Sequence, residues 1–414
     1  MNETIITREF IERIPKTDLH VHLDGSLRIP TLIEMARADN VTLPSYEEAG
    51  LKELVFKPRY DDLPDYLAGF AYTCGVMQTL EHLEQIAYEL AQDNLAEGVR
   101  YIEVRFAPQL HFGPGRDTET ILTAVNAGLE RARDDHNRTP DVASGEDLPF
   151  AYGIIVCALR SFNEHMGTYY ASLLSVLPQS APKQVYATAS TELVREAISV
   201  RNKTGLPIVG FDLAGAEHGF PAADHREAFL TAHENFLHKT VHAGEAYGPE
   251  SVFQAITQCF ANRIGHGTQL FAHDKIVDEE IEDPHMYVQR LGNYIANQRI
   301  TIEVCLTSNM QTMPHLKSPS EHSLQQMLDH NLSISICTDN RLVSNTTVSD
   351  ELDIVVKAFD VTPRQLRNMV IAGFKGSFFP GSYKEKRTYV RKVIDRYNAL
   401  EMAMLKDRRA VSRD

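Results

Sequence analysis

The chain has 414 residues, of which 43% are hydrophobic and 23% charged, the composition of an ordinary globular protein. Its formal net charge of −15 argues against nucleic acid as a partner and against docking on an anionic membrane. No apolar run approaches the roughly 18 residues of a membrane span, the N-terminus lacks the apolar core of a secretory signal, and the five scattered cysteines exclude a disulfide framework, so we expect a cytoplasmic protein.

Short β-branched segments alternate with amphipathic helical patterns along the whole chain. Because most of these segments are apolar on both faces, they are typical of parallel strands buried between layers. Eight of them predict an α/β fold with one closed (β/α)8 barrel, a TIM barrel, as a single domain over residues 1–414. The expected strands are Asp18–Leu23, Tyr101–Phe106, Phe150–Leu159, Ile208–Leu213, Lys239–His242, Arg263–His266, Thr301–Leu306 and Ser333–Thr338.

The connections between the strands differ in length and character. Arg28–Asn94 is too long for one strand-to-helix connection and predicts extra helices inserted after the first strand. Asp134–Asp147 is polar and rich in turn formers, so we expect a surface loop, and Asp278–Asp283 is an acidic excursion. The basic residues from Lys384 onward predict a solvated terminal helix. Further helices are expected over Glu81–Glu97, Thr191–Lys203, Asp224–Leu237, Glu250–Phe260, Met286–Gln298 and Pro319–Asn331.

Two histidines stand two residues apart on the first expected strand. Alternate residues of a strand share a face, so His20 and His22 project together, and in a barrel that face is the interior. Two imidazoles side by side are costly to bury unless their nitrogens are used, and a divalent metal uses them. By itself the pattern also fits a pair of hydrogen-bonded core histidines.

Further chemistry-bearing residues stand where other expected strands end. His242 closes the fifth strand, and Glu245 follows it in the next loop. His266 lies between two glycines at the end of the sixth strand, and Asp339 follows the eighth. Each alone also fits a surface turn or, for Asp339, a helix N-cap. Together they fall at the C-terminal ends of strands, which is where barrels place their active sites.

Three imidazoles and one carboxylate at that end of a barrel predict a metal site. Such a donor set suits Zn²⁺ with an open position for water, although the ligand types do not choose zinc over iron or cobalt. A bound water would have its pKa lowered to about 7, which supplies hydroxide at neutral pH. The candidates for these donors are His20, His22, His242, His266 and Asp339.

Seven short segments, taken in order, carry a family resemblance. They are Pro15–Ser26 (PKTDLHVHLDGS), Phe211–Glu217 (FDLAGAE), Val241–Glu245 (VHAGE), Arg263–Gly267 (RIGHG), Thr307–Asn309 (TSN), Cys337–Asn340 (CTDN) and Phe379–Arg387 (FPGSYKEKR). Together they resemble the adenosine deaminase family of the metal-dependent amidohydrolase superfamily, from about Ile14 to Val390. The resemblance implies a (β/α)8 barrel that binds one Zn²⁺ ion through His20, His22, His242 and Asp339.

The resemblance also implies hydrolytic deamination of a 6-aminopurine nucleoside, adenosine or 2′-deoxyadenosine, in purine salvage. Glu245 would protonate purine N1, while His266 would take the proton from the metal-bound water and orient the hydroxide. The hydroxide would add to C6, and ammonia would leave to give inosine or 2′-deoxyinosine. The implied substrate-binding residues are His22, Asp24 at the ribose 5′-hydroxyl, Gly215 through its backbone N–H at N3, and Asn340 at N7.

Two positions depart from the family pattern, because many members have Asp where this chain has Asn340 and Ala216. An Asn amide can donate a hydrogen bond to N7 but cannot titrate. These departures leave a larger 6-aminopurine nucleoside, such as 6-aminodeoxyfutalosine, as an alternative substrate. A metallo-hydrolase of esters or phosphoesters is a lesser alternative, since that reaction would not need Glu245 to protonate a ring. A nucleoside-binding protein without activity is a third, although no expected ligand is missing.

One stretch also resembles the helix that gates the pocket in this family, Asp62–Thr73. Leu63, Leu67 and Phe70 fall there at helical spacing and predict one apolar face. That face fits either a lid that excludes water from the site or ordinary core packing.

Overall fold

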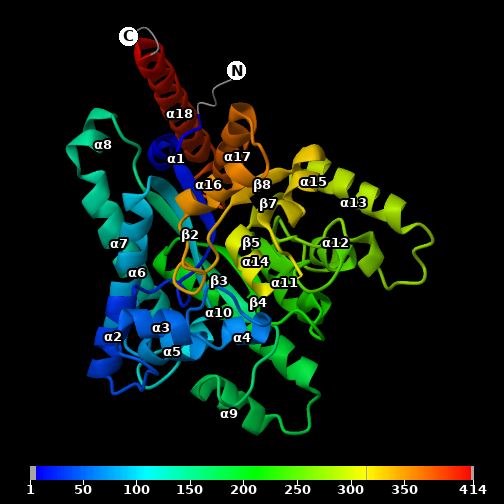
Figure 1. Cartoon of the computed structure of the whole chain (residues 1–414). Coiled ribbons are helices and arrows are strands. Elements are labelled where there is room, and N and C mark those ends of the chain that lie inside the picture. The colour runs from blue at the N-terminus through cyan, green and yellow to red at the C-terminus, as the bar shows by residue number, and fades with distance from the viewer. Residues whose placement is uncertain (1–5, 314, 412–414) are drawn as a thin grey trace.

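Eight parallel strands form a barrel at the centre of the computed structural model, which describes residues 6–313 and 315–411 (Figure 1). The strands are β1 (Lys16–His22), β2 (Val99–Phe106), β3 (Ala151–Leu159), β4 (Ile208–Ala214), β5 (His238–Ala243), β6 (Arg263–His266), β7 (Thr301–Val304) and β8 (Ser333–Ile336). Each pairs in parallel with the next in chain order. The residue Asp339 joins β8 back to β1, since its N–H donates to His20 O (2.8 Å) and its O accepts from His22 N–H (2.7 Å).

The predicted (β/α)8 barrel is confirmed, and each strand end lies within two residues of its expected position. The agreement has a simple cause in the burial of the strands. Every residue of β4 is buried, and in β2 only Arg100 is partly exposed. Because water reaches neither face of such strands, both faces must be apolar or internally paired, and short apolar runs reveal them.

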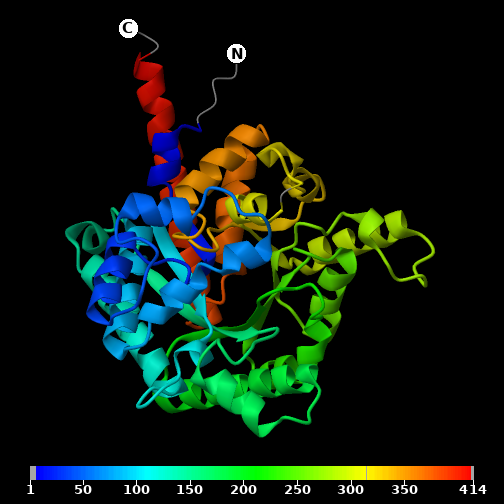
Figure 2. The same cartoon turned by 60° about the horizontal axis from the view of Figure 1, so that its bottom comes forward.

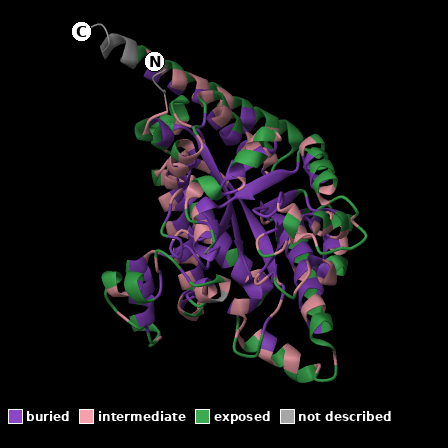
Figure 3. Ribbon diagram, turned by 45° about the vertical axis from the view of Figure 1, so that its right-hand side comes forward, coloured by how far each residue is buried: buried purple, intermediate pink, exposed green. Residues whose placement is uncertain are grey.

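Helices surround the barrel, so that the strands and inner helix faces are buried and the outer faces exposed (Figure 3). Several helices begin with proline, whose fixed φ suits the first turn. Within the described residues, no helix is long and apolar enough to cross a membrane. The helices that follow or precede the barrel strands are α1 (Arg8–Arg13), α6 (Leu80–Ala96), α7 (Thr118–Asn137), α9 (Thr168–Val176), α10 (Pro182–Thr204), α11 (Arg226–Glu234), α12 (Pro249–Gln258), α13 (Pro284–Gln298), α14 (Leu306–Thr312), α15 (Leu324–Asp329), α16 (Val348–Ala358), α17 (Pro363–Gly376) and α18 (Tyr383–Val411).

The long connection after β1 holds the predicted extra helices. They gather beside the barrel in Figures 1 and 2, where they are coloured blue. The expected gating helix is broken in two, because residues 68 and 69 interrupt the helical stretch. The inserted helices are α2 (Ile29–Ala38), α3 (Glu48–Leu54), α4 (Leu63–Leu67) and α5 (Phe70–Val76).

Two local predictions were wrong. Asp134–Asp147 is not a plain surface loop, because α7 runs to Asn137 and a short helix, α8 (Pro140–Ser144), follows it. Proline at its first position and Gly145 in the left-handed conformation (φ 82°) after its end define that helix. The helix expected over Pro319–Asn331 is shorter, since only a 3₁₀ turn and α15 are helical there.

The barrel interior contains a charged cluster. The side chain of Arg105 donates to Asp212 (2.8 Å) and to Glu303 (2.9 Å). Arg263 donates to Glu303 (2.5 Å) and to Glu103. These five side chains are almost completely buried, and a buried charge is tolerated only when it is paired in this way. The cluster lies directly beneath the histidines of the candidate site and contacts them.

Candidate metal centre and active site

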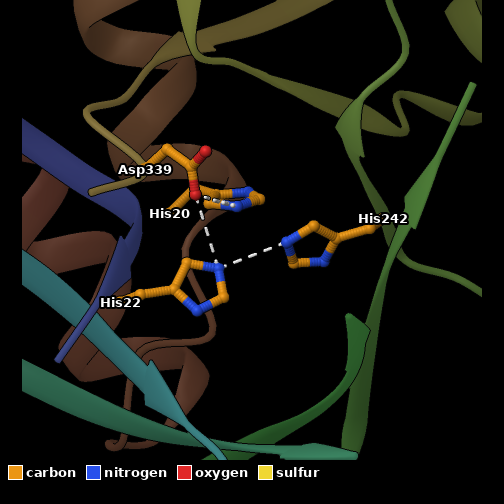
Figure 4. Close-up of side chains that lie close together, drawn as sticks. All are labelled: His20, His22, His242 and Asp339. Carbon is orange, nitrogen blue, oxygen red and sulfur yellow. Dashed lines mark hydrogen bonds and ion pairs between the residues drawn. The ribbon is translucent and has the colours of Figure 1, made fainter. Parts of the chain in front are cut away.

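Four side chains, from β1, from β5 and from the segment that follows β8, converge at the mouth of the barrel (Figure 4). Each of the four side chains offers one possible ligand atom, and these four atoms all lie within 4.8 Å of one another. Nε2 of His22 lies 3.2 Å from Nε2 of His242 and 3.5 Å from Oδ1 of Asp339. The same Oδ1 is 3.4 Å from Nε2 of His20. The structure therefore brings together the four residues that the sequence analysis named.

The donor atoms of this cluster fit a cation better than they fit one another. Nε2 of His20 is buried and has no hydrogen-bond partner among the described residues. Two neutral imidazole nitrogens that both point their lone pairs inward repel each other unless a positive charge lies between them. Three nitrogens and one carboxylate oxygen are a donor set that zinc-like divalent ions accept. The cluster could therefore hold a divalent metal ion.

Two buried carboxylates orient the imidazoles of the cluster. Glu303 Oε2 lies 2.8 Å from Nδ1 of His20, and Asp212 Oδ2 lies 3.1 Å from Nδ1 of His242. A carboxylate accepts a hydrogen, so each Nδ1 carries the proton and each Nε2 directs a lone pair into the cluster. Burial alone would raise the pKa of Asp212, but His242 and Arg105 hold that pKa well below its usual range, so it stays ionised.

The carboxylate of Asp339 is held by an unusual backbone and by a serine. Asp339 has φ 62° and His266 has φ 65°, in the left-handed region that non-glycine residues rarely adopt. Such conformations cost about 1–3 kcal/mol each and persist where surrounding bonds impose them. For Asp339 those bonds are the two backbone hydrogen bonds to β1 and a bond from Ser308 Oγ to Oδ2 (2.6 Å). The other oxygen, Oδ1, is thereby directed at the histidines.

Glu245 lies partly buried at the same cavity on a loop that is held by Glu217. The carboxylate of Glu217 accepts from the backbone N–H groups of residues 244–247 at 2.6–3.1 Å. Burial, with the nearby charges of Asp339 and Glu217, raises the pKa of Glu245 to about 8. Thr312 Oγ1 also donates to it, at 3.4 Å. The carboxyl of Glu245 therefore keeps its proton to a higher pH than an ordinary glutamate does.

A cavity of about 730 Å³ opens above the cluster. A pocket of this size is typical of sites for drug-sized small molecules. His20 lies beneath the floor of the cavity rather than in its lining. The cavity is lined by the other site residues named from the sequence: His22, Asp24, Gly215, His242, Glu245, His266, Asp339 and Asn340.

Comparison with known proteins decides the family. The chain matches the model of the adenosine deaminase family over residues 15–396. The chain belongs to the adenosine deaminase family. Its members are metal-dependent hydrolases that act on C–N bonds, and the chemistry of the cluster agrees with that class.

Individual relatives support the assignment to the adenosine deaminase family. A probable adenosine deaminase from Dictyostelium discoideum is 32% identical over 91% of this chain, which corresponds to 42% of that longer protein. Adenosine deaminase 1 from Streptomyces coelicolor is 34% identical over 93% of this chain and 87% of the relative. Among solved structures, an amidohydrolase from Burkholderia ambifaria with bound zinc has a TM-score of 0.74, covers 98% of this chain and 97% of its own, and is 16% identical. This last likeness shows the fold alone.

Sequence reasoning missed several residues of this deaminase-family site. Asp212 and Glu303 were not assigned a role, although each is an acidic residue within a short apolar strand. That signal is available in the sequence, since a charge on a buried strand must be paired. The partner was not predictable, because Arg105 contacts both carboxylates from a distant strand.

Two residues that line the cavity, Asp24 and Asn340, each have a buried oxygen without a hydrogen-bond partner among the described residues. Asp24 Oδ1 is buried and has no hydrogen-bond partner among the described residues, and burial raises the pKa of Asp24 to about 7. Asn340 donates from Nδ2 to the hydroxyl of Tyr66 (2.9 Å), while its Oδ1 is buried and likewise lacks a partner within the described chain. Gly215 has φ 99°, which favours glycine at that turn.

The two short helices α4 and α5 cover the opposite, apolar side. Leu63, Leu67 and Phe70 are partly buried, pack against the core and line the cavity. Core packing and contact with the cavity are therefore both present at this face. A gating motion of these helices stays a prediction.

Replacing Gly25 with alanine is expected to lower the free energy of unfolding by about 1–3 kcal/mol, the usual cost of overpacking. A Cβ at Gly25 would lie 1.8 Å from Asn340 Oδ1, and Asn340 is buried and bonded to Tyr66. Gly75→Ala is the matched control, because its Cβ would meet Val41 at an ordinary 3.5 Å. Urea denaturation measures both variants. Equal midpoints for the two would contradict the close approach.

Proposed function

We propose that this protein catalyses the hydrolytic deamination of adenosine or 2′-deoxyadenosine to inosine or 2′-deoxyinosine and ammonia, with one Zn²⁺ ion per chain. The observation that carries this proposal is that the carboxyl of Glu245 lines the same cavity as a buried cluster of metal-type donors. The names of the relatives, adenosine deaminase, support the substrate. The bound zinc of a structural neighbour supports the choice of metal.

The metal would be held by the four clustered side chains, with a position left open toward the cavity. When bound, zinc would lower the pKa of a water ligand and supply the nucleophile for C6. Asp212 and Glu303 would keep the imidazoles oriented, as outer carboxylates do in many metal sites. The ligands in this proposal are His20, His22, His242 and Asp339.

Glu245 would act as the general acid. A neutral purine ring resists attack at C6 until a proton is delivered to N1, so a carboxylic acid must donate there. The oxygen of water adds to C6 while N1 gains the proton of Glu245. Of the two protons that the water loses, one goes to the amino group, which leaves as ammonia when the C6–N bond breaks, and the other restores Glu245. His266 would face the attacking oxygen. Whether it takes or gives a hydrogen there depends on which of its ring nitrogens carries one.

The remaining cavity residues would bind the nucleoside. The backbone N–H of Gly215 would donate to N3, and Asn340 would contact N7. Asp24, whose Oδ1 lacks a partner among the described residues, would bind the ribose 5′-hydroxyl. His22 would border the substrate as well as the metal.

A larger 6-aminopurine nucleoside, such as 6-aminodeoxyfutalosine, is the second candidate substrate. Two features support this candidate substrate: the cavity volume of about 730 Å³ and the uncharged side chain of Asn340. A metallo-hydrolase of esters is less well supported, because ester hydrolysis needs no acid that protonates a ring nitrogen and would give Glu245 no role. The cytoplasmic location, a small nucleoside as partner and the single domain over residues 1–414 stay predictions of the sequence.

The test is an absorbance assay of adenosine deamination by the purified protein, with and without a chelator. We expect turnover that the chelator abolishes and that added zinc restores. Comparison of kcat/KM for adenosine, 2′-deoxyadenosine and 6-aminodeoxyfutalosine ranks the substrates. A zinc-loaded protein that releases ammonia from none of them would exclude the proposed function.

Asp212→Asn is expected to weaken metal binding by about 10–100-fold, the usual effect of removing an outer carboxylate. The amide cannot replace the charge that fixes the proton on Nδ1 of His242. Competition with a chromogenic chelator measures the affinity, and Asp360→Asn, at an exposed position, is the matched control. An unchanged affinity in a folded Asp212→Asn protein would contradict the orienting role.

A further inference from the structure

A chain of buried polar groups leads from the start of α15 to the active-site cavity. The backbone N–H of Leu324 donates to Nδ1 of His322 at 3.1 Å. Nε2 of His322 lies 3.3 Å from Oδ1 of Asn309, and Nδ2 of Asn309 lies 3.1 Å from Nδ1 of His266. Both histidines and Asn309 are almost completely buried.

The backbone fixes the direction of every hydrogen bond in this chain. A peptide N–H can only donate, so Nδ1 of His322 must be an acceptor without hydrogen. The neutral ring then carries its hydrogen on Nε2, which donates to Asn309 Oδ1. The amide oxygen is thereby turned toward His322, and the amide N–H₂ must point at Nδ1 of His266. That nitrogen is therefore an acceptor, and the hydrogen of neutral His266 is on Nε2.

Both rings are neutral in this environment, as the chain of bonds requires. Burial lowers the pKa of His322 to about 4. The Nδ1 of His266 is engaged by Asn309, so Nε2 is the ring nitrogen left for the cavity that His266 lines.

We propose that His322 and Asn309 are positioning residues that hold His266 as the tautomer with hydrogen on Nε2, so that His266 donates a hydrogen bond to the oxygen that adds to the purine instead of taking a proton from it. This inference rests on the proposed function for its chemical consequence, and it replaces the expectation that His266 is the base. The tautomer itself depends only on the hydrogen bonds described above.

The neighbouring histidines show the opposite arrangement. His20 and His242 have a carboxylate at Nδ1, which places hydrogen on Nδ1 and leaves Nε2 bare for a metal. His266 is similarly close, with its ring centroid 4.8 Å from that of His20, but it has an amide donor at Nδ1. The group behind each ring therefore separates the histidines into metal ligands and a hydrogen-bond donor.

The direct test is ¹⁵N NMR of imidazole-labelled, zinc-loaded protein at neutral pH, without substrate. The shifts of Nδ1 and Nε2 distinguish the two neutral tautomers from the charged ring, and His266→Ala and His322→Ala spectra assign the signals. We expect hydrogen on Nε2 of both residues. Hydrogen on Nδ1 of either ring, or a charged His266, would overturn the proposal.

Asn309→Asp reverses the arrangement, because a carboxylate can only accept. Both rings would then donate to it, and the hydrogen of His266 would move to Nδ1. The wrong tautomer of a catalytic histidine can cost about 10⁴-fold in kcat, and we expect a loss of at least about 100-fold with KM nearly unchanged. Asn297→Asp, an exposed position, is the matched control. Reversal of the tautomer with wild-type kcat would refute the donor role.

A second pair of variants covers the case in which Asn309→Asp does not fold. His322→Gln keeps an N–H donor for Asn309, whereas His322→Leu removes it. We expect the glutamine variant to retain the Nε2 tautomer of His266 and most of the activity, and the leucine variant to lose both. Equal activity and equal NMR signals in the two would overturn the positioning role. A wild-type protein with the expected tautomers but no deamination would instead contradict the proposed function alone.

Discussion

Glu245→Gln is expected to lower kcat for adenosine by about 10²–10⁴-fold, the usual contribution of general acid catalysis. Glutamine has nearly the same shape and can still donate a hydrogen bond, but it cannot transfer a proton to N1. Nucleoside binding should therefore persist while turnover fails. Glu245 lines the cavity, so this small change removes the proton donor from the reaction site, and we expect its effect on kcat to be among the largest.

Steady-state kinetics and equilibrium binding of adenosine, measured together, test this expectation. Glu279→Gln is the matched control, because Glu279 is exposed. The pH profile gives a further check on the same carboxyl. The acid must be protonated to act, and its pKa is raised to about 8, so kcat/KM should fall as the pH rises through about 8. Preserved kcat in the glutamine variant would remove Glu245 from the role of acid.

His242→Ala is expected to remove the metal and, with it, deamination. The variant loses one of three nitrogen donors and also leaves Asp212 without the imidazole that it orients. With two histidines and one carboxylate remaining, the affinity should drop enough for the ion to be lost during purification. Elemental analysis should find about one zinc per wild-type chain and close to none in the variant.

His285→Ala is the matched control for metal content, since His285 is an exposed histidine on α13. Its zinc content should equal that of the wild type. A folded His242→Ala protein with a full equivalent of zinc would contradict the ligand assignment. Circular dichroism of both variants separates loss of metal from loss of fold.

Local patterns in the sequence were sufficient to predict the barrel. Strands buried on both faces must be apolar runs, and those runs, such as Ile208–Ala214, are visible without any knowledge of their neighbours. The two-residue spacing of His20 and His22 likewise fixes a shared face, because strand geometry is local. The predicted loop at Asp134–Asp147 failed because Pro140 starts a helix there, and a turn-rich composition hides such short helices.

The barrel, the residues at its strand ends and the kind of chemistry that they can perform could be predicted from the sequence, because each of these follows from spacing along one strand and from residue type. The hydrogen bonds that orient these groups could be identified only in the folded protein. Asp212 and Glu303 orient the ligands, Glu217 holds the Glu245 loop, and His322 acts on His266 through Asn309. Those relations depend on hydrogen bonds between strands and helices far apart in the chain, and closure of the barrel is the physical event that brings them together.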